Sequence, residues 1–174
     1  MYKRQVIGVY AALCKAEGAA FRFPGPQHVY RGVLHQMTDA HALARASLWA
    51  ATADAARNQA FNYVHEPFRW ERIWTKVADA FGLQIGPPMP MKLADHMADK
   101  AQAWSALAGS GGLADTPYDK LVGWGFGDFV FNSDFDLVSD MTKIRLAGFT
   151  ETVDTADALI GAIRRLQERK VLPA

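Results

Sequence analysis

The chain has 174 residues, of which 50% are hydrophobic and 21% are charged, and its formal net charge is +1. This composition predicts a folded protein with a buried core and argues against disorder. No Lys/Arg cluster with interleaved aromatic residues is present, so we expect no nucleic-acid partner. No apolar run approaches the length of a membrane span and no signal-peptide pattern opens the chain, which favours a cytoplasmic protein without a membrane partner. Cys14 is the only cysteine, so no disulfide can form within the chain, and its place on an apolar stripe predicts a buried side chain.

The first five residues are a separate case. Met1–Gln5 has the sequence that results from translating a common transposase-adapter end, and the pattern behind it starts abruptly inside a helix. We therefore expect residues 1–5 to be a non-native leader and residues 6–174 to be the protein itself. The alternative is a natural N-terminus with two basic residues.

Helical periodicity dominates the rest of the chain. Residues 6–14 carry an apolar stripe that Gly18 ends, and Thr38 or Asp39 is placed to cap the next helix. The strongest helical pattern follows, and Gly82 ends it. We expect about seven helices in all.

One helix near the C-terminal end is predicted from capping residues. Ser133 and Asp136 are in capping-box positions ahead of an apolar pattern that runs from about residue 135 to 146, and Gly148 is a suitable stop.

Two or three short strands complete the expected elements. Residues 20–23 favour a short extended segment, and residues 29–37 and 60–64 are typical of strands. The three prolines of residues 86–91 can continue neither a ladder nor a helix, which predicts an internal linker there. So few strands cannot form a stable sheet alone, so we expect a partner sheet from residues outside this chain.

Recognised motifs for phosphate and metal binding are missing. The glycine runs 109–112 and 123–127 do not follow a strand, as a dinucleotide-binding turn requires, and in the second run small residues favour close helix packing. Asp95, His96 and Asp99 lack zinc spacing and are interpreted as a solvated face. We therefore predict no cofactor-binding and no metal-binding residue.

Large apolar side chains are concentrated in one short stretch. This stretch has two interpretations, core packing or the wall of an apolar ligand pocket, and periodicity alone does not separate them. Its members are Trp124, Phe126, Phe129, Phe131, Phe135 and Met141.

Several segments, taken in order, resemble a known family. They are Val9–Gly18, Phe21–Gly25, Asp39 with Leu48–Ala51, Ala60–Asn62 with Phe68–Trp70 and Trp74, Trp124–Asp128, Ser139–Lys143, Gly148–Phe149 and Val171–Pro173. Together they resemble the C-terminal half of the progesterone 5β-reductase/iridoid synthase-like enzymes, the enone-reducing branch of the extended short-chain dehydrogenases/reductases. The resemblance covers essentially everything after Gln5. It implies an α/β, helix-dominated fold, the C-terminal, substrate-side portion of a Rossmann-type enzyme.

The resemblance also implies an activity for the full-length enzyme. Members of this branch pass a hydride from NADPH or NADH to an α,β-unsaturated carbonyl, and a Tyr supported by a Lys stabilises the enolate oxygen. The family's glycine-rich turn, Tyr and Lys lie in its N-terminal half. Here Tyr10 and Lys15 are five residues apart, about 140° around a helix, which does not match the family's four-residue spacing. We therefore expect no catalytic residue and no bound cofactor in this chain alone, with a missing N-terminal Rossmann half as its partner and a possible homodimer when complete.

The pocket's far wall is the part of the family's site that carries over. Phe126 is the first candidate for contact with a small apolar carbonyl substrate, followed by Trp124 and Met141. Two alternatives remain, a free-standing non-catalytic module that binds apolar ligands, and an interaction subunit that pairs through a sheet edge with a separate chain. Uncovered apolar faces also predict poor solubility of the isolated chain.

Overall fold

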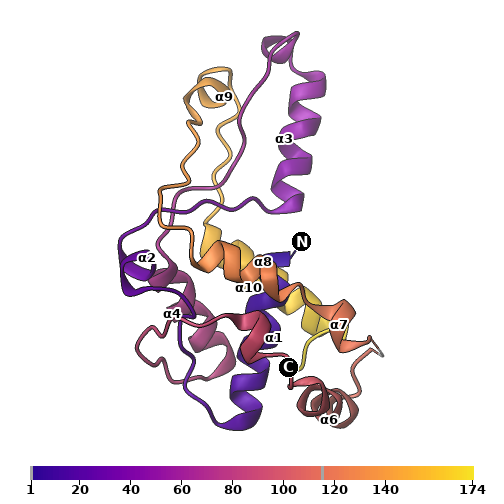
Figure 1. The fold of residues 1–174 in the computed structure, drawn as a ribbon. Helices are drawn as coiled ribbons and strands as arrows, with labels where there is room; N and C mark the ends of the chain where they lie inside the picture. The colour runs from indigo at the N-terminus through magenta and orange to yellow at the C-terminus, as the bar shows by residue number, and fades with distance from the viewer. Residues whose placement is uncertain (1, 115) are drawn as a thin grey trace.

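The computed structural model describes residues 2–114 and 116–174, and within them all regular elements are helices. The elements are α1 (Tyr2–Glu17), α2 (Gln27–Arg31), α3 (Ala40–Thr52), the 3₁₀ helix η1 (Asp54–Ala56), α4 (Trp70–Phe81), α5 (Leu93–His96), α6 (Ala101–Gly111), α7 (Tyr118–Leu121), α8 (Trp124–Phe131), α9 (Thr142–Leu146) and α10 (Thr155–Glu168). Figure 1 shows a helical body around α1, from which α3 and α9 project as an arm. None of the described helices has both the length and the apolarity of a membrane span.

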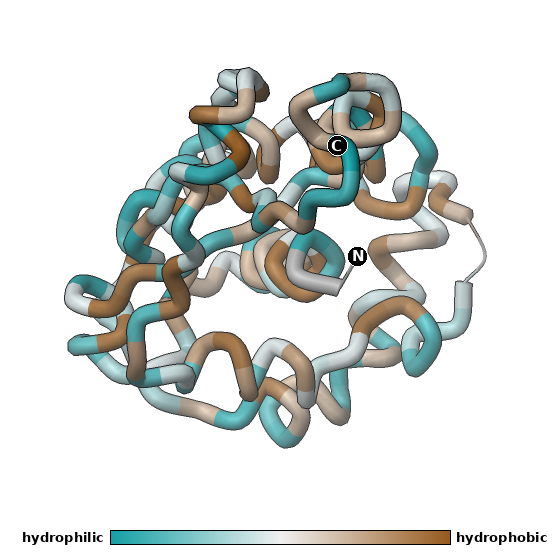
Figure 2. Tube along the Cα trace, turned by 90° about the horizontal axis from the view of Figure 1, so that it is seen from above, coloured by the Kyte–Doolittle hydropathy of each residue, from teal (hydrophilic) through white to brown (hydrophobic). Residues whose placement is uncertain are grey.

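The body is built on a core that is rich in aromatic side chains. Helix α1 packs against α4, α8 and α10, and its N-terminal end lies near the middle of the molecule in the view from above (Figure 2). Phe21 stacks on Trp74 of α4 with ring centroids 4.7 Å apart, while Phe23 meets the same indole edge to face at 5.1 Å. The stripe predicted for α4 is therefore the centre of the core, and Gly82 ends the helix in the left-handed conformation with φ of 67°.

The arm has a small core of its own. Its buried members pack with partly buried hydrophobic residues that come from α3 and from the connection between η1 and α4. They are Ala46, Met141, Ile144 and Phe149, with Trp49, Phe61, Tyr63 and Val64 against them. Asp39 caps α3 by accepting hydrogen bonds from two first-turn amides, which confirms the predicted helix start.

The prediction of two or three strands is wrong for the described residues. Residues 27–31 belong to α2, and beyond them only an isolated antiparallel bridge joins His35 to Phe68. Side chains and single backbone bonds hold this stretch. The Leu34 N–H donates to the Asp136 carboxylate at 2.8 Å, the Ser139 N–H donates to the Gln36 side-chain oxygen at 2.5 Å, and the Leu137 N–H donates to the Leu34 carbonyl at 2.9 Å. Residues 60–64 form no bridge at all.

The helix predicted from about residue 135 to 146 is also wrong in its first half. Only α9 is helical in this stretch, because Asp136 is engaged by Leu34 and Ser133 donates its hydroxyl to the Phe129 carbonyl at 2.9 Å. Both side chains of the expected capping box thus bind elsewhere, and residues 134–141 run as an irregular segment to the arm.

The proline-containing segment of residues 86–91 lies along residues 21–24. Gly86 donates its N–H to the Phe21 carbonyl at 3.2 Å, and Met89 and Met91 donate to the carbonyls of Phe23 and Pro24. A parallel bridge joins Phe21 to Ile85 at the start of this contact. The segment is held against the body along its length.

Candidate functional site

A cavity of about 370 Å³ lies where the foot of the arm meets the body. The residues before α3, the side chain of His65, and one face of α10 form its walls, and α8 contributes an aromatic ring. Its lining includes Met37, Thr38, His65, Phe126, Leu159 and Ala162. Most of these surfaces are apolar, as expected for a small-molecule site with few polar groups.

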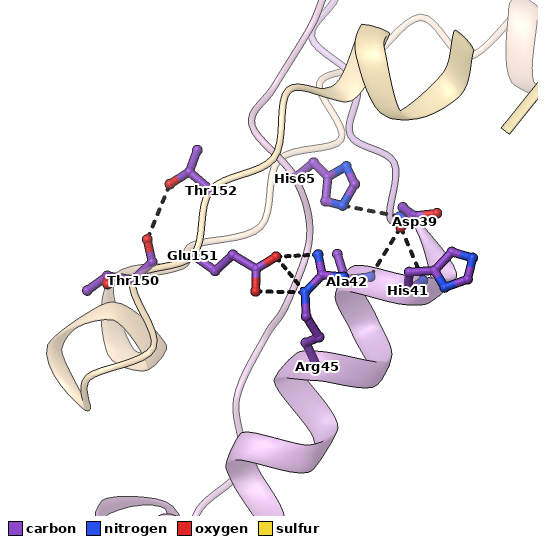
Figure 3. Close-up of polar contacts among 8 residues, drawn as sticks. All are labelled: Asp39, His41, Ala42, Arg45, His65, Thr150, Glu151 and Thr152. Carbon is purple, nitrogen blue, oxygen red and sulfur yellow. Dashed lines mark hydrogen bonds and ion pairs between the residues drawn. The ribbon is translucent and has the colours of Figure 1, made fainter. Parts of the chain in front are cut away.

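His65 is the most buried polar side chain of this cavity, with 3% of its surface exposed. Its Nε2 accepts a hydrogen bond from the Asp39 N–H at 3.2 Å (Figure 3), so the ring proton of the neutral form sits on Nδ1. Nδ1 is buried without a hydrogen-bond partner among the described residues. Burial lowers the pKa of His65, which keeps the ring neutral near pH 7.

The Asp39 carboxylate makes three structural contacts. Its Oδ2 accepts from the N–H groups of His41 and Ala42 at 3.1 Å each, and its Oδ1 lies 3.5 Å from the Arg165 guanidinium (Figure 3 shows the amide bonds). The carboxylate thus caps α3 and lies beside a guanidinium, while the backbone N–H of the same residue binds the His65 ring. We therefore assign Asp39 a positioning role toward His65.

An ion pair connects α3 to the segment that precedes α10. Arg45 of α3 donates to both Glu151 oxygens, with Nε at 2.8 and 2.9 Å from them (Figure 3). These hydrogen bonds lower the pKa of Glu151. The pair ties α3 to the segment that leads into α10, which fixes the two walls of the cavity relative to each other.

The structure brings one of the three predicted substrate-contact residues to this cavity. Phe126 lines it and is 38% exposed. Trp124, at the start of the same helix, packs against the main core with its ring 6.3 Å from that of Tyr118. Met141 is buried in the arm core, where its sulfur accepts a hydrogen bond from the Val64 N–H at 3.3 Å.

The other candidate residues of the sequence take part in packing, backbone turns or structural hydrogen bonds. Cys14 is buried, and this burial raises the pKa of its thiol to about 11, which is not the property of a nucleophile. The Tyr10 hydroxyl donates to the Arg22 carbonyl at 3.1 Å. Gly112 ends α6 in the left-handed conformation, and a Cβ on Gly127 would lie 2.8 Å from the Val6 side chain, so this glycine permits the close approach of α8 and α1.

Asp95, His96 and Asp99 are exposed. Among the described residues, no group of three His, Cys, Asp or Glu side chains is placed to hold a metal ion. His65 was not predicted as a site residue, because the Asp39–His65 contact joins residues 26 positions apart and leaves no local spacing signal.

Comparison with known proteins places the chain in a defined class. The model of the PRISE-like Rossmann-fold domain matches residues 2–173, and the chain belongs to this family. The predicted resemblance to the 5β-reductase/iridoid synthase-like enzymes is thereby confirmed.

Individual relatives have related names. The chain is 32% identical over 169 residues to an (S)-8-oxocitronellyl enol synthase of Nepeta cataria, and 28% identical over 170 residues to an enzyme of the same name from Catharanthus roseus. It is 27% identical over 169 residues to a 3-oxo-Delta(4,5)-steroid 5-beta-reductase of Arabidopsis thaliana. Each match covers 95% of this chain and 43% of the relative, so the chain spans less than half the length of these proteins.

Proposed function

We propose that this chain forms the substrate-side part of an NAD(P)H-dependent reductase that acts on apolar α,β-unsaturated carbonyl compounds. The observation that carries the proposal is the position of Phe126, the predicted substrate contact, on a cavity of about 370 Å³. Membership of a Rossmann-fold family whose relatives are named as an enol synthase and a steroid reductase supports the reaction class. In this proposal the apolar body of the substrate lies against Phe126, Leu159 and Ala162.

The described residues do not fit a nicotinamide dinucleotide. Binding of its pyrophosphate requires a strand, a glycine-rich turn and a helix N-terminus. Residues 109–112 end a helix, and residues 123–127 open α8 with no strand before them. We therefore propose that the cofactor-binding and catalytic groups belong to polypeptide outside this chain, and we assign this chain the role of holding and orienting the substrate.

A fused protein tests this function. The chain is joined to the residues of the Nepeta cataria synthase that the match leaves out, and oxidation of NADPH is followed with a small cyclic enone. We expect turnover, and we expect Phe126→Ala to raise KM about tenfold, since part of an aromatic contact surface is lost. Phe129→Ala is the matched control, because this residue of the same helix is 65% exposed and does not line the cavity. Absence of turnover, or equal effects of the two variants, would contradict the proposal.

The cavity also supports the second candidate function, a non-catalytic module that binds apolar ligands. Residues of this chain line it without help from another chain. Binding of an apolar fluorescent probe to the isolated protein, weakened by Phe126→Ala and not by Phe129→Ala, would favour this candidate if the fused protein shows no turnover.

A further inference from the structure

The cavity at the foot of the arm has oxygen atoms among its lining residues that can accept hydrogen bonds from a ligand. They belong to Thr38, Asp39 and Thr155. Thr38 is exposed, whereas Asp39 keeps 15% of its side-chain surface and Thr155 is 4% exposed. The last two are largely shielded from water, and a hydrogen bond is electrostatically stronger in such surroundings.

Both threonine hydroxyls have already committed their protons. Thr155 donates to the Glu66 carbonyl at 2.9 Å, and Thr38 donates to the Tyr63 carbonyl at 3.4 Å. A hydroxyl has one proton and two acceptor lone pairs, so each of these oxygens can meet a ligand only as an acceptor. No N–H or O–H group among the described residues donates to the Thr155 oxygen, which leaves its lone pairs available.

Asp39 adds a third acceptor. Its Oδ2 accepts from the first-turn amides of α3, whereas its Oδ1 lies 3.5 Å from the Arg165 guanidinium. The His65 ring adds no acceptor, because its Nε2 already accepts from the Asp39 N–H (Figure 3). A ligand that uses this side of the cavity must therefore donate a hydrogen bond.

The charges of the lining residues favour a neutral donor. Arg4 of α1 brings a guanidinium to the same cavity, and its Nε is buried without a hydrogen-bond partner among the described residues. An ammonium ligand would be repelled by this guanidinium, and a carboxylate ligand would meet Asp39 and two hydroxyls without a free proton. A hydroxyl is neutral and both donates and accepts, so it suits both kinds of group.

We propose that the cavity binds the hydroxyl group of a hydroxylated apolar compound, with Thr155 as the principal acceptor and the apolar skeleton against Phe126, Leu159 and Ala162. This inference rests on the proposed function, whose substrate it narrows to α,β-unsaturated carbonyl compounds that carry a hydroxyl at a second position. An analogue without that hydroxyl would displace water from these oxygens and give no hydrogen bond in return, which lowers its affinity.

Binding of matched ligands to the chain tests the inference. The ligands are a decalol, its methyl ether and the corresponding decalone, which share one bicyclic skeleton, and only the alcohol donates a hydrogen bond. Displacement of an apolar fluorescent probe is expected to show that the alcohol binds at least about tenfold more tightly than the ether or the ketone. Equal affinities, or no binding by any of them, would overturn the inference. Tighter binding of the corresponding decalin carboxylate would also overturn it and would assign the site to an anion.

Variants of Thr155 identify the acceptor. Thr155→Val removes the oxygen and should abolish the preference for the alcohol, while Thr155→Ser keeps the oxygen and should retain the preference. Thr75→Val is the matched control, because the Thr75 hydroxyl also donates to a backbone carbonyl at 2.9 Å and does not line the cavity.

Thermal unfolding shows which of these variants fold. If Thr155→Val does not fold, Thr155→Cys takes its place with the same expectation, because a thiol is a weak acceptor. A preference for the alcohol that survives in the folded variant, or that is lost equally in Thr75→Val, would overturn the inference.

The fused protein separates this inference from the proposed function. Turnover of a hydroxylated bicyclic enone and of its deoxy analogue with equal KM would leave the reductase standing and overturn the hydroxyl site. A preference of the isolated chain for the alcohol, together with a fusion that does not oxidise NADPH, would leave the hydroxyl site standing and remove the reductase.

Discussion

Asp128 and Leu93 are joined by a hydrogen bond of 2.5 Å in which the α8 carboxylate accepts from the backbone N–H that begins α5. The second carboxylate oxygen accepts from the Ala94 N–H at 3.1 Å. Lys92, the residue in the cap position of α5, contributes no side-chain cap, so Asp128 caps the helix from a distance of 34 residues or more in sequence.

Asp128→Ala is expected to lower the free energy of unfolding by about 1–2 kcal/mol, the usual cost of removing a helix cap. Urea unfolding followed by circular dichroism measures the change. Asp134→Ala is the control, since this exposed side chain should change stability by less than about 0.5 kcal/mol. Similar losses in both variants would argue against the cap.

Two glycines of α8 should respond in opposite directions to the same substitution. A Cβ on Gly127 would lie 2.8 Å from the Val6 side chain and 3.3 Å from that of Leu93, whereas a Cβ on Gly125 would have no neighbour within 4 Å. We expect Gly127→Ala to destabilise by about 1–3 kcal/mol through overpacking, and Gly125→Ala to stabilise by up to about 1 kcal/mol through helix propensity. Thermal unfolding of both variants measures these changes in stability. A change of the same sign in both variants would contradict the close approach of α8 and α1.

His65 should make stability depend on pH near neutrality. Burial lowers its pKa in the folded protein, so the unfolded chain binds the proton more readily. The contribution of the neutral ring is fully present above the unfolded pKa of about 6.5 and is lost as the pH falls through that value. The free energy of unfolding should therefore decrease between about pH 7.5 and 5.5.

His65→Gln provides the comparison for this pH effect. The amide does not titrate, so the variant should show a smaller decrease over the same range. Glu151 and Asp154 also have lowered pKa values, and their stabilising contributions are lost only at lower pH, toward the ordinary carboxyl range. Parallel profiles for the two proteins would exclude His65 as the titrating group.

Cys14 should be almost unreactive in the folded protein. Cys14 is 6% exposed, and the raised pKa of its thiol, about 11, leaves little thiolate near neutral pH. Alkylation by iodoacetamide at about pH 8 is expected to be on the order of a hundredfold slower than in denaturant. Equal alkylation rates in the folded protein and in denaturant would show that the face of helix α1 around Cys14 opens easily to the reagent.

The helices that bury a clear apolar stripe were predictable from the sequence. The α4 stripe around Trp74, the glycine stop at Gly82 and the Asp39 cap of α3 depend on neighbours a few residues away, so local patterns report them. The failed predictions depend on distant partners. Asp136 binds Leu34 across 102 residues and does not cap a helix, and no local pattern reports such a contact.

The candidate site was predictable only in part. The resemblance to the family pointed to Phe126, and the structure places that ring on the cavity. The same reasoning grouped Met141 with Phe126 because both are large and apolar, yet the sulfur of Met141 packs in the arm core. Periodicity indicates which side chains are buried. It does not indicate which of the two cores of this chain a buried side chain joins.

The separate arm core has a spectroscopic consequence. Trp49 packs there, whereas Trp70, Trp74, Trp104 and Trp124 belong to or pack against the main core. A variant in which Phe replaces the four tryptophans of the body would have one remaining tryptophan, Trp49, and its fluorescence would come from the arm. Its emission maximum would follow the arm independently of the body, and a red shift at denaturant concentrations below the main transition would mean that the two cores open in separate steps.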